Sequence, residues 1–185
     1  MVLTPSSMIP LGSAAPDFML SDAVSGSKYS LNDLKSEKAT VIMFICNHCP
    51  YVKHVQDGLV DLANDYISKK ISFIAINSND ADNYPEDSPE RMKAVAENLG
   101  YPFPYLFDEL QEVANAYDAT CTPDFFIYDK DLKLAYRGQM DDSRPGNGMP
   151  VTGRDLRIAL DELLAGNELS PNQVPSIGCN IKWRT

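Results

Sequence analysis

Two uninterrupted apolar runs mark the first half of the chain. Residues 39–45 (ATVIMFI) and 71–76 (ISFIAI) are rich in β-branched and aromatic side chains and show no polar alternation. Such runs are typical of strands that are covered by protein on both faces. Between them, residues 50–68 place apolar side chains at helical spacing, which predicts an amphipathic helix. The order strand–helix–strand predicts parallel strands joined by a right-handed crossover.

Shorter elements are predicted along the rest of the chain. A turn at residues 25–27 between two short apolar segments predicts a hairpin near the N-terminus. A helix is expected to begin at Asp87-Ser88-Pro89 and to end at Gly100. The remaining expected elements are an extended piece at 103–107, a helix at 109–117, strands at 125–128 and 132–137, and a helix ending near 166. This order predicts an α/β fold, a mixed central sheet with helices on both faces.

The chain length fits one domain with extensions, because its 185 residues lie within the common range for a single domain. Residues 1–16 are rich in Pro and Ser and are expected to form a loose N-terminal lead-in. Residues 17–166 carry the predicted domain. Residues 167–185 form a C-terminal tail, and its apolar Ile177, Ile181 and Trp183 predict that it docks on the domain.

Charge and composition exclude some classes of partner. The formal net charge is −10, which argues against a general nucleic-acid binder and against binding to anionic membranes. No segment is long and apolar enough to span a bilayer, and residues 1–13 lack the pattern of a secretory signal, so we expect a cytoplasmic protein. In a reducing compartment, the four cysteines are expected to be reactive, buried or metal-binding. The acidic insert at residues 79–90 is expected to be a solvated loop.

The motif Cys46-Asn47-His48-Cys49 lies between the first predicted buried strand and the helix that follows it. A C-x-x-C motif in a β-α-β unit is typical of redox proteins. Free backbone N–H groups at a helix N-terminus stabilise a thiolate, which is the reactive form. We expect Cys46 to attack the substrate and Cys49, one turn further, to resolve the mixed disulfide.

His48 lies between the two cysteines and is the candidate for tuning them. A partly protonated imidazole would favour the Cys46 thiolate, and we therefore expect a more oxidising disulfide than a Gly-Pro dipeptide would give. The alternatives are half of a zinc site, a pair of inert core cysteines, and a His48 that simply faces solvent. No second C-x-x-C or paired histidine at ligand spacing supports the zinc alternative.

Four segments resemble the redoxin (AhpC/TSA) group of thioredoxin-like proteins, in its peroxiredoxin-like or thioredoxin family protein branch. The resemblance covers nearly the whole chain, from about Pro10 onward. The segments are FICNHCPYV at 44–52, CTPDFFI at 121–127, RGQMDDSRP at 137–145 and GCNIKW at 178–183.

The resemblance implies a thioredoxin-like fold in which Pro123 is the cis-proline that faces the dithiol. The catalytic candidates are Cys46, Cys49, His48 and Pro123. The candidates for binding substrate are Asn47, Thr122 and Arg144. The group also includes antioxidant thiol peroxidases, which makes peroxide reduction an alternative activity.

Two departures from related patterns affect the expected chemistry. Aligning the peroxidatic cysteine of peroxiredoxins on Cys49 places Ile42 and Cys46 at the positions of their activating Pro and Thr, and Pro123 falls at the position of their Arg. Thioredoxins have a buried Asp about six residues before the first cysteine, and this chain has Thr40 there. The first departure favours disulfide exchange over peroxide reduction, and the second removes a proton acceptor for Cys49.

Cys121 and Cys179 are candidate auxiliary thiols. Cys121 precedes Pro123 by two residues, so it is either a small buried side chain or a third thiol that exchanges with the dithiol. Cys179 either packs the tail, or acts as a mobile resolving cysteine, or pairs with Cys121.

The leading interpretation is a thiol–disulfide oxidoreductase that exchanges a Cys46–Cys49 disulfide with a protein or a small thiol. Its partners would be that substrate and an external reductant. No nucleotide or flavin motif is visible, so we expect no cofactor. The alternatives are a thiol peroxidase and a non-catalytic domain that binds copper, zinc or iron through Cys46, Cys49 and His48.

Overall fold

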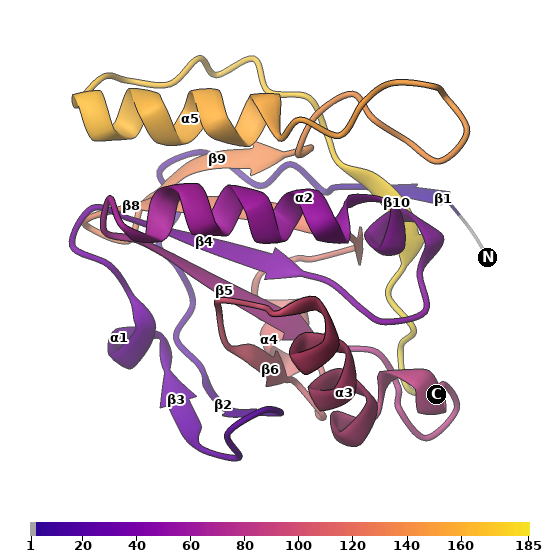
Figure 1. Ribbon diagram of the computed structural model, residues 1–185. Helices are drawn as coiled ribbons and strands as arrows, with labels where there is room; N and C mark the ends of the chain where they lie inside the picture. The colour runs from indigo at the N-terminus through magenta and orange to yellow at the C-terminus, as the bar shows by residue number, and fades with distance from the viewer. Residues whose placement is uncertain (1–2) are drawn as a thin grey trace.

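The computed structural model describes residues 3–185, which fold around a seven-stranded sheet in the order β3-β2-β6-β5-β4-β8-β9 (Figure 1). β4 at the centre pairs in parallel with β5 and antiparallel with β8, so the sheet is mixed, as predicted. The strands are β2 (Met19–Asp22), β3 (Lys28–Ser30), β4 (Ala39–Phe44), β5 (Ile71–Asn77), β6 (Tyr105–Phe107), β8 (Asp124–Asp129) and β9 (Leu134–Gly138).

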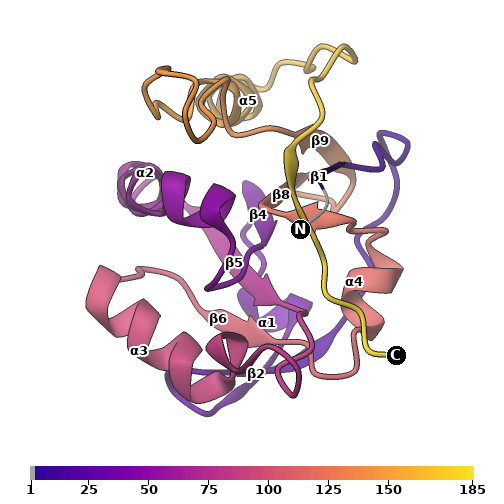
Figure 2. The same cartoon turned by 90° about the vertical axis from the view of Figure 1, so that its right-hand side faces the viewer.

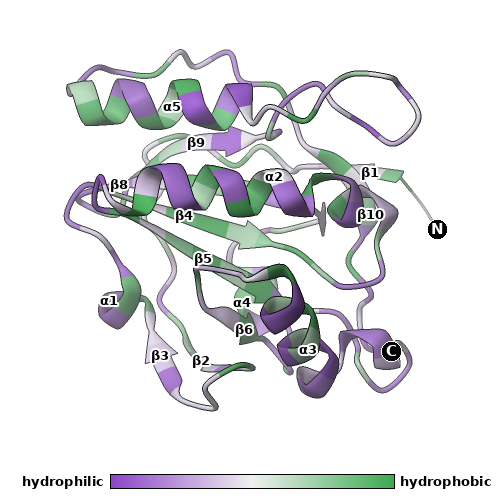
Figure 3. Ribbon diagram, viewed as in Figure 1, coloured by the Kyte–Doolittle hydropathy of each residue, from purple (hydrophilic) through white to green (hydrophobic). Residues whose placement is uncertain are grey.

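Helices cover both faces of this sheet. The core on one face includes side chains of α2 (Pro50–Ile67), α3 (Pro89–Leu99) and α5 (Arg154–Ala165). The core on the other face includes side chains of α1 (Leu31–Leu34) and α4 (Glu112–Ala116). β4 is buried along its whole length between the two cores, which explains why it is apolar at every position except Thr40 (Figure 3). No helix within residues 3–185 has the length and apolarity needed to cross a membrane.

The expected helix ends are present. Cys49 is the residue before the first turn of α2, and Pro50 occupies the first turn, where its missing N–H costs nothing. The Ser88 side chain accepts a hydrogen bond from the backbone of Arg91 at the start of α3. Gly100 ends that helix in the left-handed conformation, with φ 65°.

A second, three-stranded sheet joins segments that the sequence pattern did not identify as strands. Its order is β1 (Leu3–Pro5), β10 (Ile177–Asn180) and β7 (Cys121–Thr122), all antiparallel. Residues 3–5 are therefore paired and not a loose lead-in. Figure 2 shows β10 running beside β1 and the chain then continuing to its C-terminus near α4.

The acidic insert at residues 79–90 is not a solvated loop, and that expectation was wrong. Asn79, Asp80 and Asp87 are all buried. The segment contains the short 3-10 helix η1 (Pro85–Asp87) and is held to the tail, since the Asp80 amide donates to the Lys182 carbonyl (2.9 Å). The side chains of Asn79, Asp80 and Asp87 are buried because they hydrogen-bond to backbone groups and to other side chains of the site and the segment.

Candidate active site

The C-x-x-C motif lies where β4 ends and α2 begins, as the sequence predicted. Cys46 is 2% exposed and Cys49 is fully buried. The Cys46 sulfur receives backbone hydrogen bonds from His48 and Cys49, which belong to the turn that opens α2. This placement gives Cys46 the helix N-terminal environment expected for a redox thiol.

The loop before β8 faces both cysteines. The Thr122–Pro123 peptide bond is cis. The Thr122 hydroxyl lies 3.2 Å from the Cys46 sulfur, and the Thr122 carbonyl oxygen lies 3.3 Å from the Cys49 sulfur. The structure therefore brings together Cys46, Cys49, Thr122 and the adjacent Pro123.

The disulfide in the structure joins Cys49 to Cys179, across 130 positions of sequence, with a Cα–Cα distance of 6.2 Å. Cys46 and Cys121 are free thiols. The Cys46–Cys49 disulfide expected from the sequence is not the one present in the structure, and of the three alternatives left open for Cys179 the pairing with Cys121 is wrong. The reason is the second sheet, which places Cys179 directly opposite Thr122 and so beside Cys49.

Cys121 is a buried thiol outside this group of sulfurs. It precedes Thr122 in β7, and successive side chains of a strand point to opposite faces. Its sulfur lies 3.6 Å from the Pro123 carbonyl oxygen. Burial, together with the charge of Asp124, raises the pKa of the Cys121 thiol far above its usual value, so this thiol stays protonated. These observations favour the packing role over exchange.

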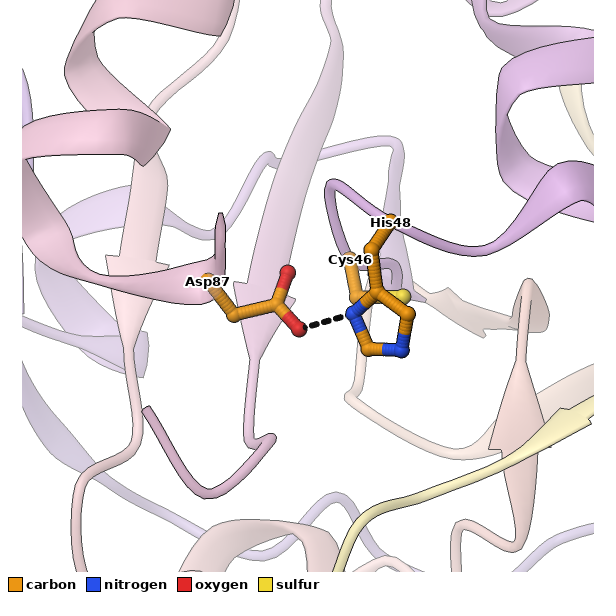
Figure 4. Close-up of side chains that lie close together, drawn as sticks. All are labelled: Cys46, His48 and Asp87. Carbon is orange, nitrogen blue, oxygen red and sulfur yellow. Dashed lines mark hydrogen bonds and ion pairs between the residues drawn. The ribbon is translucent and has the colours of Figure 1, made fainter. Parts of the chain in front are cut away.

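His48 forms a pair with Asp87, which the sequence analysis did not identify as a site residue. The His48 Nδ1–H donates to Asp87 Oδ2 at 2.6 Å (Figure 4). The His48 ring also stacks on Tyr84, with 5.3 Å between centroids and 8° between planes. Asp87 further accepts from the Asn47 amide (2.7 Å) and from Asn79 Nδ2 (2.8 Å). His48 is therefore held in place and does not simply face solvent.

The only sequence signal for Asp87 was its position in a polar segment after a buried strand. Side chains at the carboxyl ends of the parallel strands β4 and β5 meet at one edge of the sheet, and both the C-x-x-C motif and this segment follow such ends. Asp87 also directly precedes Ser88, the N-cap of α3, so its sequence context indicates a helix start and not a site residue.

The charge of Asp87 acts on Cys46. Burial opposes ionisation of Asp87, but the hydrogen bonds from His48, Asn79 and the Asn47 amide together lower the pKa of its carboxyl. Burial and then the Asp87 charge raise the pKa of Cys46 to about 11, against the smaller effect of its hydrogen bonds. The expected stabilised thiolate is thus absent in this disulfide state, and Cys46 is a protonated thiol at neutral pH.

Asn47 and Arg144, two of the expected substrate-binding residues, are engaged within the protein. Asn47 Nδ2 donates to the Glu86 carbonyl (2.8 Å), and its Oδ1 accepts from the Tyr105 hydroxyl (3.0 Å). The Arg144 guanidinium donates to Gln139 Oε1 (2.6 Å) and to two carbonyls of its own loop. Arg144 also lines a small pocket beside Pro123. Within residues 3–185, no arginine donates a hydrogen bond to a cysteine sulfur.

Three side chains of the site could hold a metal ion. Ligand atoms of Cys46, His48 and Asp87 all lie within 4.8 Å of one another. Thiolate, imidazole and carboxylate are the ligands that Zn²⁺ takes in proteins. The ligand set expected from the sequence included Cys49, but the Cys49 sulfur is bonded to Cys179 in this structure.

The fold, the C-x-x-C motif at a helix N-terminus and the facing proline loop define a redoxin, a thioredoxin-like protein with a redox-active thiol. The chain belongs to the AhpC/TSA family, whose family model matches residues 11–137. The redoxin resemblance and the thioredoxin-like fold expected from the sequence are thereby confirmed.

Curated relatives carry a more specific name. The thiol-disulfide oxidoreductase ResA of Geobacillus thermodenitrificans is 28% identical over 131 residues, which are 71% of this chain and 70% of that protein. The protein of the same name from Geobacillus kaustophilus is 28% identical over 139 residues, 74% of this chain and 75% of the other.

Solved structures agree on the fold. An uncharacterized conserved protein from Geobacillus kaustophilus is 65% identical, with a TM-score of 0.98, covering 100% of this chain and 97% of that one. A hypothetical protein from Sinorhizobium meliloti is 49% identical, with a TM-score of 0.96, covering 98% and 99%. The thioredoxin domain of a thiol-disulfide oxidoreductase from Bacteroides vulgatus is 17% identical with a TM-score of 0.63, covering 82% and 99%, and shares the fold.

Proposed function

We propose that this protein is a thiol–disulfide oxidoreductase that acts through Cys46 and Cys49. The observation that carries the proposal is that the two sulfurs, which lie at the start of α2, both contact Thr122 of β7, and that one of them is already part of a disulfide. Curated relatives with the name thiol-disulfide oxidoreductase, matching about 70% of each chain, support the same activity.

In the proposed reaction, the Cys46 thiolate attacks one sulfur of a substrate disulfide and the other substrate sulfur leaves as a thiolate. The Cys49 thiolate then attacks the Cys46 sulfur of the mixed disulfide and releases the second substrate thiol. The substrate gains two electrons and the protein holds a Cys46–Cys49 disulfide. An external dithiol returns the pair to its reduced form.

The His48–Asp87 pair provides the proton acceptor for this step. Asp87 accepts the Nδ1–H of His48, which leaves Nε2 free to take the proton of the Cys46 thiol. His48 and Cys46 each offer a possible ligand atom, and these atoms lie within 4.8 Å of each other, so the imidazole and the thiol are close in space. Without an acceptor, a thiol with a pKa of about 11 would attack slowly at neutral pH.

The proposed substrate is a disulfide in a protein or in a small thiol compound. A cytoplasmic location is part of the proposal, because dithiol reductants that can reset the pair are maintained there. Fractionation of cells that contain the protein tests the location independently of the activity.

The activity is tested by reduction of a protein disulfide, such as that of insulin, in the presence of dithiothreitol. We expect the protein to accelerate the reaction over dithiothreitol alone, and Cys46→Ser to abolish the acceleration. Cys121→Ala is the matched control, because its thiol is buried outside the group of reactive sulfurs, and it should keep the wild-type rate.

Hydrogen peroxide replaces the disulfide in the second arm of the test. A Cys46 reaction no faster than that of a free thiolate of equal pKa supports disulfide exchange. A much faster peroxide reaction, combined with disulfide reduction that survives Cys46→Ser, would contradict the proposal and favour the antioxidant peroxidase alternative.

A further inference from the structure

We propose that Cys179 is the last member of an intramolecular thiol relay, in which the disulfide formed between Cys46 and Cys49 is transferred to Cys49 and Cys179. This inference rests on the proposed function and adds a second internal exchange to it. The state seen in the structure is then the product of the relay, with Cys49–Cys179 oxidised and Cys46 returned to a free thiol.

Thr122 is the common neighbour of the three cysteines. Its hydroxyl contacts the Cys46 sulfur and its carbonyl oxygen contacts the Cys49 sulfur. Its backbone pairs with Cys179 across β7 and β10. Cys49 is bonded to Cys179 and shares its neighbour Thr122 with Cys46, so all three cysteines gather around one residue, as an exchange between them requires.

The tail strand is fitted closely to this loop. Gly178 approaches Thr122 so closely that a Cβ there would lie 1.9 Å from the Thr122 carbonyl oxygen. The Ser176 hydroxyl donates to the Pro123 carbonyl at 2.6 Å. β1 pairs along the other edge of β10 and secures it from the outside. Cys179 is thus held at the site by the fold as well as by its disulfide.

The transfer step balances without an added oxidant. The Cys179 thiolate attacks the Cys49 sulfur of the Cys46–Cys49 disulfide, the Cys49–Cys179 bond forms, and the Cys46–Cys49 bond breaks. Cys46 leaves as a thiolate and takes up the proton that Cys179 lost. The protein stays oxidised by two electrons, and the external dithiol of the proposed function later reduces the Cys49–Cys179 disulfide.

The product state protects the attacking cysteine. Cys46 is 2% exposed in the structure, so it is shielded from solvent oxidants. The relay would therefore store the oxidation on the buried Cys49–Cys179 pair until a dithiol arrives.

A disulfide time course on the reduced protein tests the relay. The protein is mixed with a small cyclic disulfide, quenched in acid at increasing times and alkylated, and its disulfides are assigned by peptide mass mapping. We expect Cys46–Cys49 to form first and to decay as Cys49–Cys179 appears with Cys46 alkylated. This wild-type series requires no variant that might fail to fold.

Two variants separate the relay from a static structural disulfide. In Cys179→Ala, the reaction should stop at Cys46–Cys49, while the first release of substrate thiol keeps the wild-type rate within about twofold. In Cys46→Ser, Cys49–Cys179 should form at least about tenfold more slowly, because the relay begins at Cys46. Cys121→Ala is the control and should form the same disulfides in the same order as the wild type.

Two results would overturn the relay: a Cys46–Cys49 disulfide that persists in the wild type, or a Cys49–Cys179 disulfide that forms at the wild-type rate in Cys46→Ser. In both cases, substrate reduction that still depends on Cys46 would leave the proposed function intact. Substrate reduction by Cys46→Ser would instead contradict the proposed function itself.

Discussion

At the scale of single residues, Asp87 sets the charge around Cys46. It is fully buried, yet its pKa is lowered because His48, Asn79 and the Asn47 amide donate to its carboxylate. That negative charge raises the pKa of the Cys46 thiol, second only to burial. The same carboxylate orients His48, so one residue both suppresses the resting thiolate and positions the base that forms it.

Asp87→Asn removes this charge with little change of shape. We expect the pKa of Cys46 in the oxidised protein to fall, and each unit of decrease gives about tenfold more thiolate below the pKa. The pH dependence of Cys46 alkylation by iodoacetamide measures the shift. Asp82→Asn, an exposed acid in the same segment, is the control. Equal alkylation profiles for wild type and Asp87→Asn would contradict this assignment.

Asp124 gives the fold a pH dependence of its own. Burial raises the pKa of its carboxyl to about 7, although Ser6 and the backbone amides of Thr120 and Phe125 donate to it. An acid whose pKa is raised by folding stabilises the protein fully only below its unfolded pKa, and that stability is lost as the pH rises through the folded pKa. The loss therefore falls between pH 3.8 and about 7.

Asp124→Asn should remove this component. Between about pH 5 and about pH 8, we expect the free energy of unfolding of the wild type to fall by about 2 kcal/mol relative to the variant. Urea unfolding at the two pH values measures the difference. If the free energies of unfolding of the wild type and of Asp124→Asn differed by the same amount at both pH values, Asp124 would have an ordinary pKa and this assignment would be contradicted.

The sequence identified the residues with strong local signals and missed those that depend on tertiary contacts. Cys46, His48 and Cys49 are adjacent in sequence at a strand–helix junction, so their role could be predicted. Asp87 reaches them only because the segment after β5 folds back over the site. No local sequence pattern reveals the charge of a buried, hydrogen-bonded carboxylate. The sequence therefore predicted a lowered pKa for Cys46, whereas burial and the Asp87 charge raise it.

At the scale of elements, the sequence predicted the long helices and strands, and it missed short strands that form only through contacts between distant segments. β4, β5 and α2 have continuous or helical apolar patterns, and the structure has them within a residue or two of the expected limits. β1, β7 and β10 span three, two and four residues, too few to show a period. These short strands form through pairing between distant segments, and they decide which cysteine pairs with Cys49.

Gly178→Ala tests the fit of β10 against β7. A Cβ would meet backbone atoms of Thr122 and Pro123, which no side-chain rotation relieves. We expect a loss of about 2 kcal/mol in the free energy of unfolding and slower formation of the Cys49–Cys179 disulfide. Ile177→Ala, at a 41% exposed position of the same strand, is the control. Wild-type stability in Gly178→Ala would show that β10 is free to move away from the loop.

At the scale of the whole molecule, the Cys49–Cys179 disulfide closes about 70% of the chain into one loop, because the paired positions are 130 residues apart in a chain of 185. Such a link reduces the conformational freedom of the unfolded chain. The redox state of the site is thereby coupled to the stability of the domain and to the attachment of its tail.

Reduction of this disulfide should lower the free energy of unfolding by about 5 kcal/mol in the loop-entropy description. Denaturant unfolding of the oxidised protein, the reduced protein and Cys179→Ala measures the effect. The last two should resemble each other and both should be less stable than the oxidised form. Equal midpoints for all three would mean that the disulfide does not form in the folded protein.

The most direct test of the central claim is to trap the mixed disulfide. A Cys49→Ser, Cys179→Ala double variant lacks both internal thiols that could resolve it, and Cys46 and Cys121 remain. After reaction with an aromatic disulfide, peptide mass analysis should find a persistent adduct on Cys46 and an unmodified Cys121. An adduct on Cys121 alone, or none under conditions in which the wild type reduces the same compound, would contradict the assignment of Cys46 as the attacking thiol.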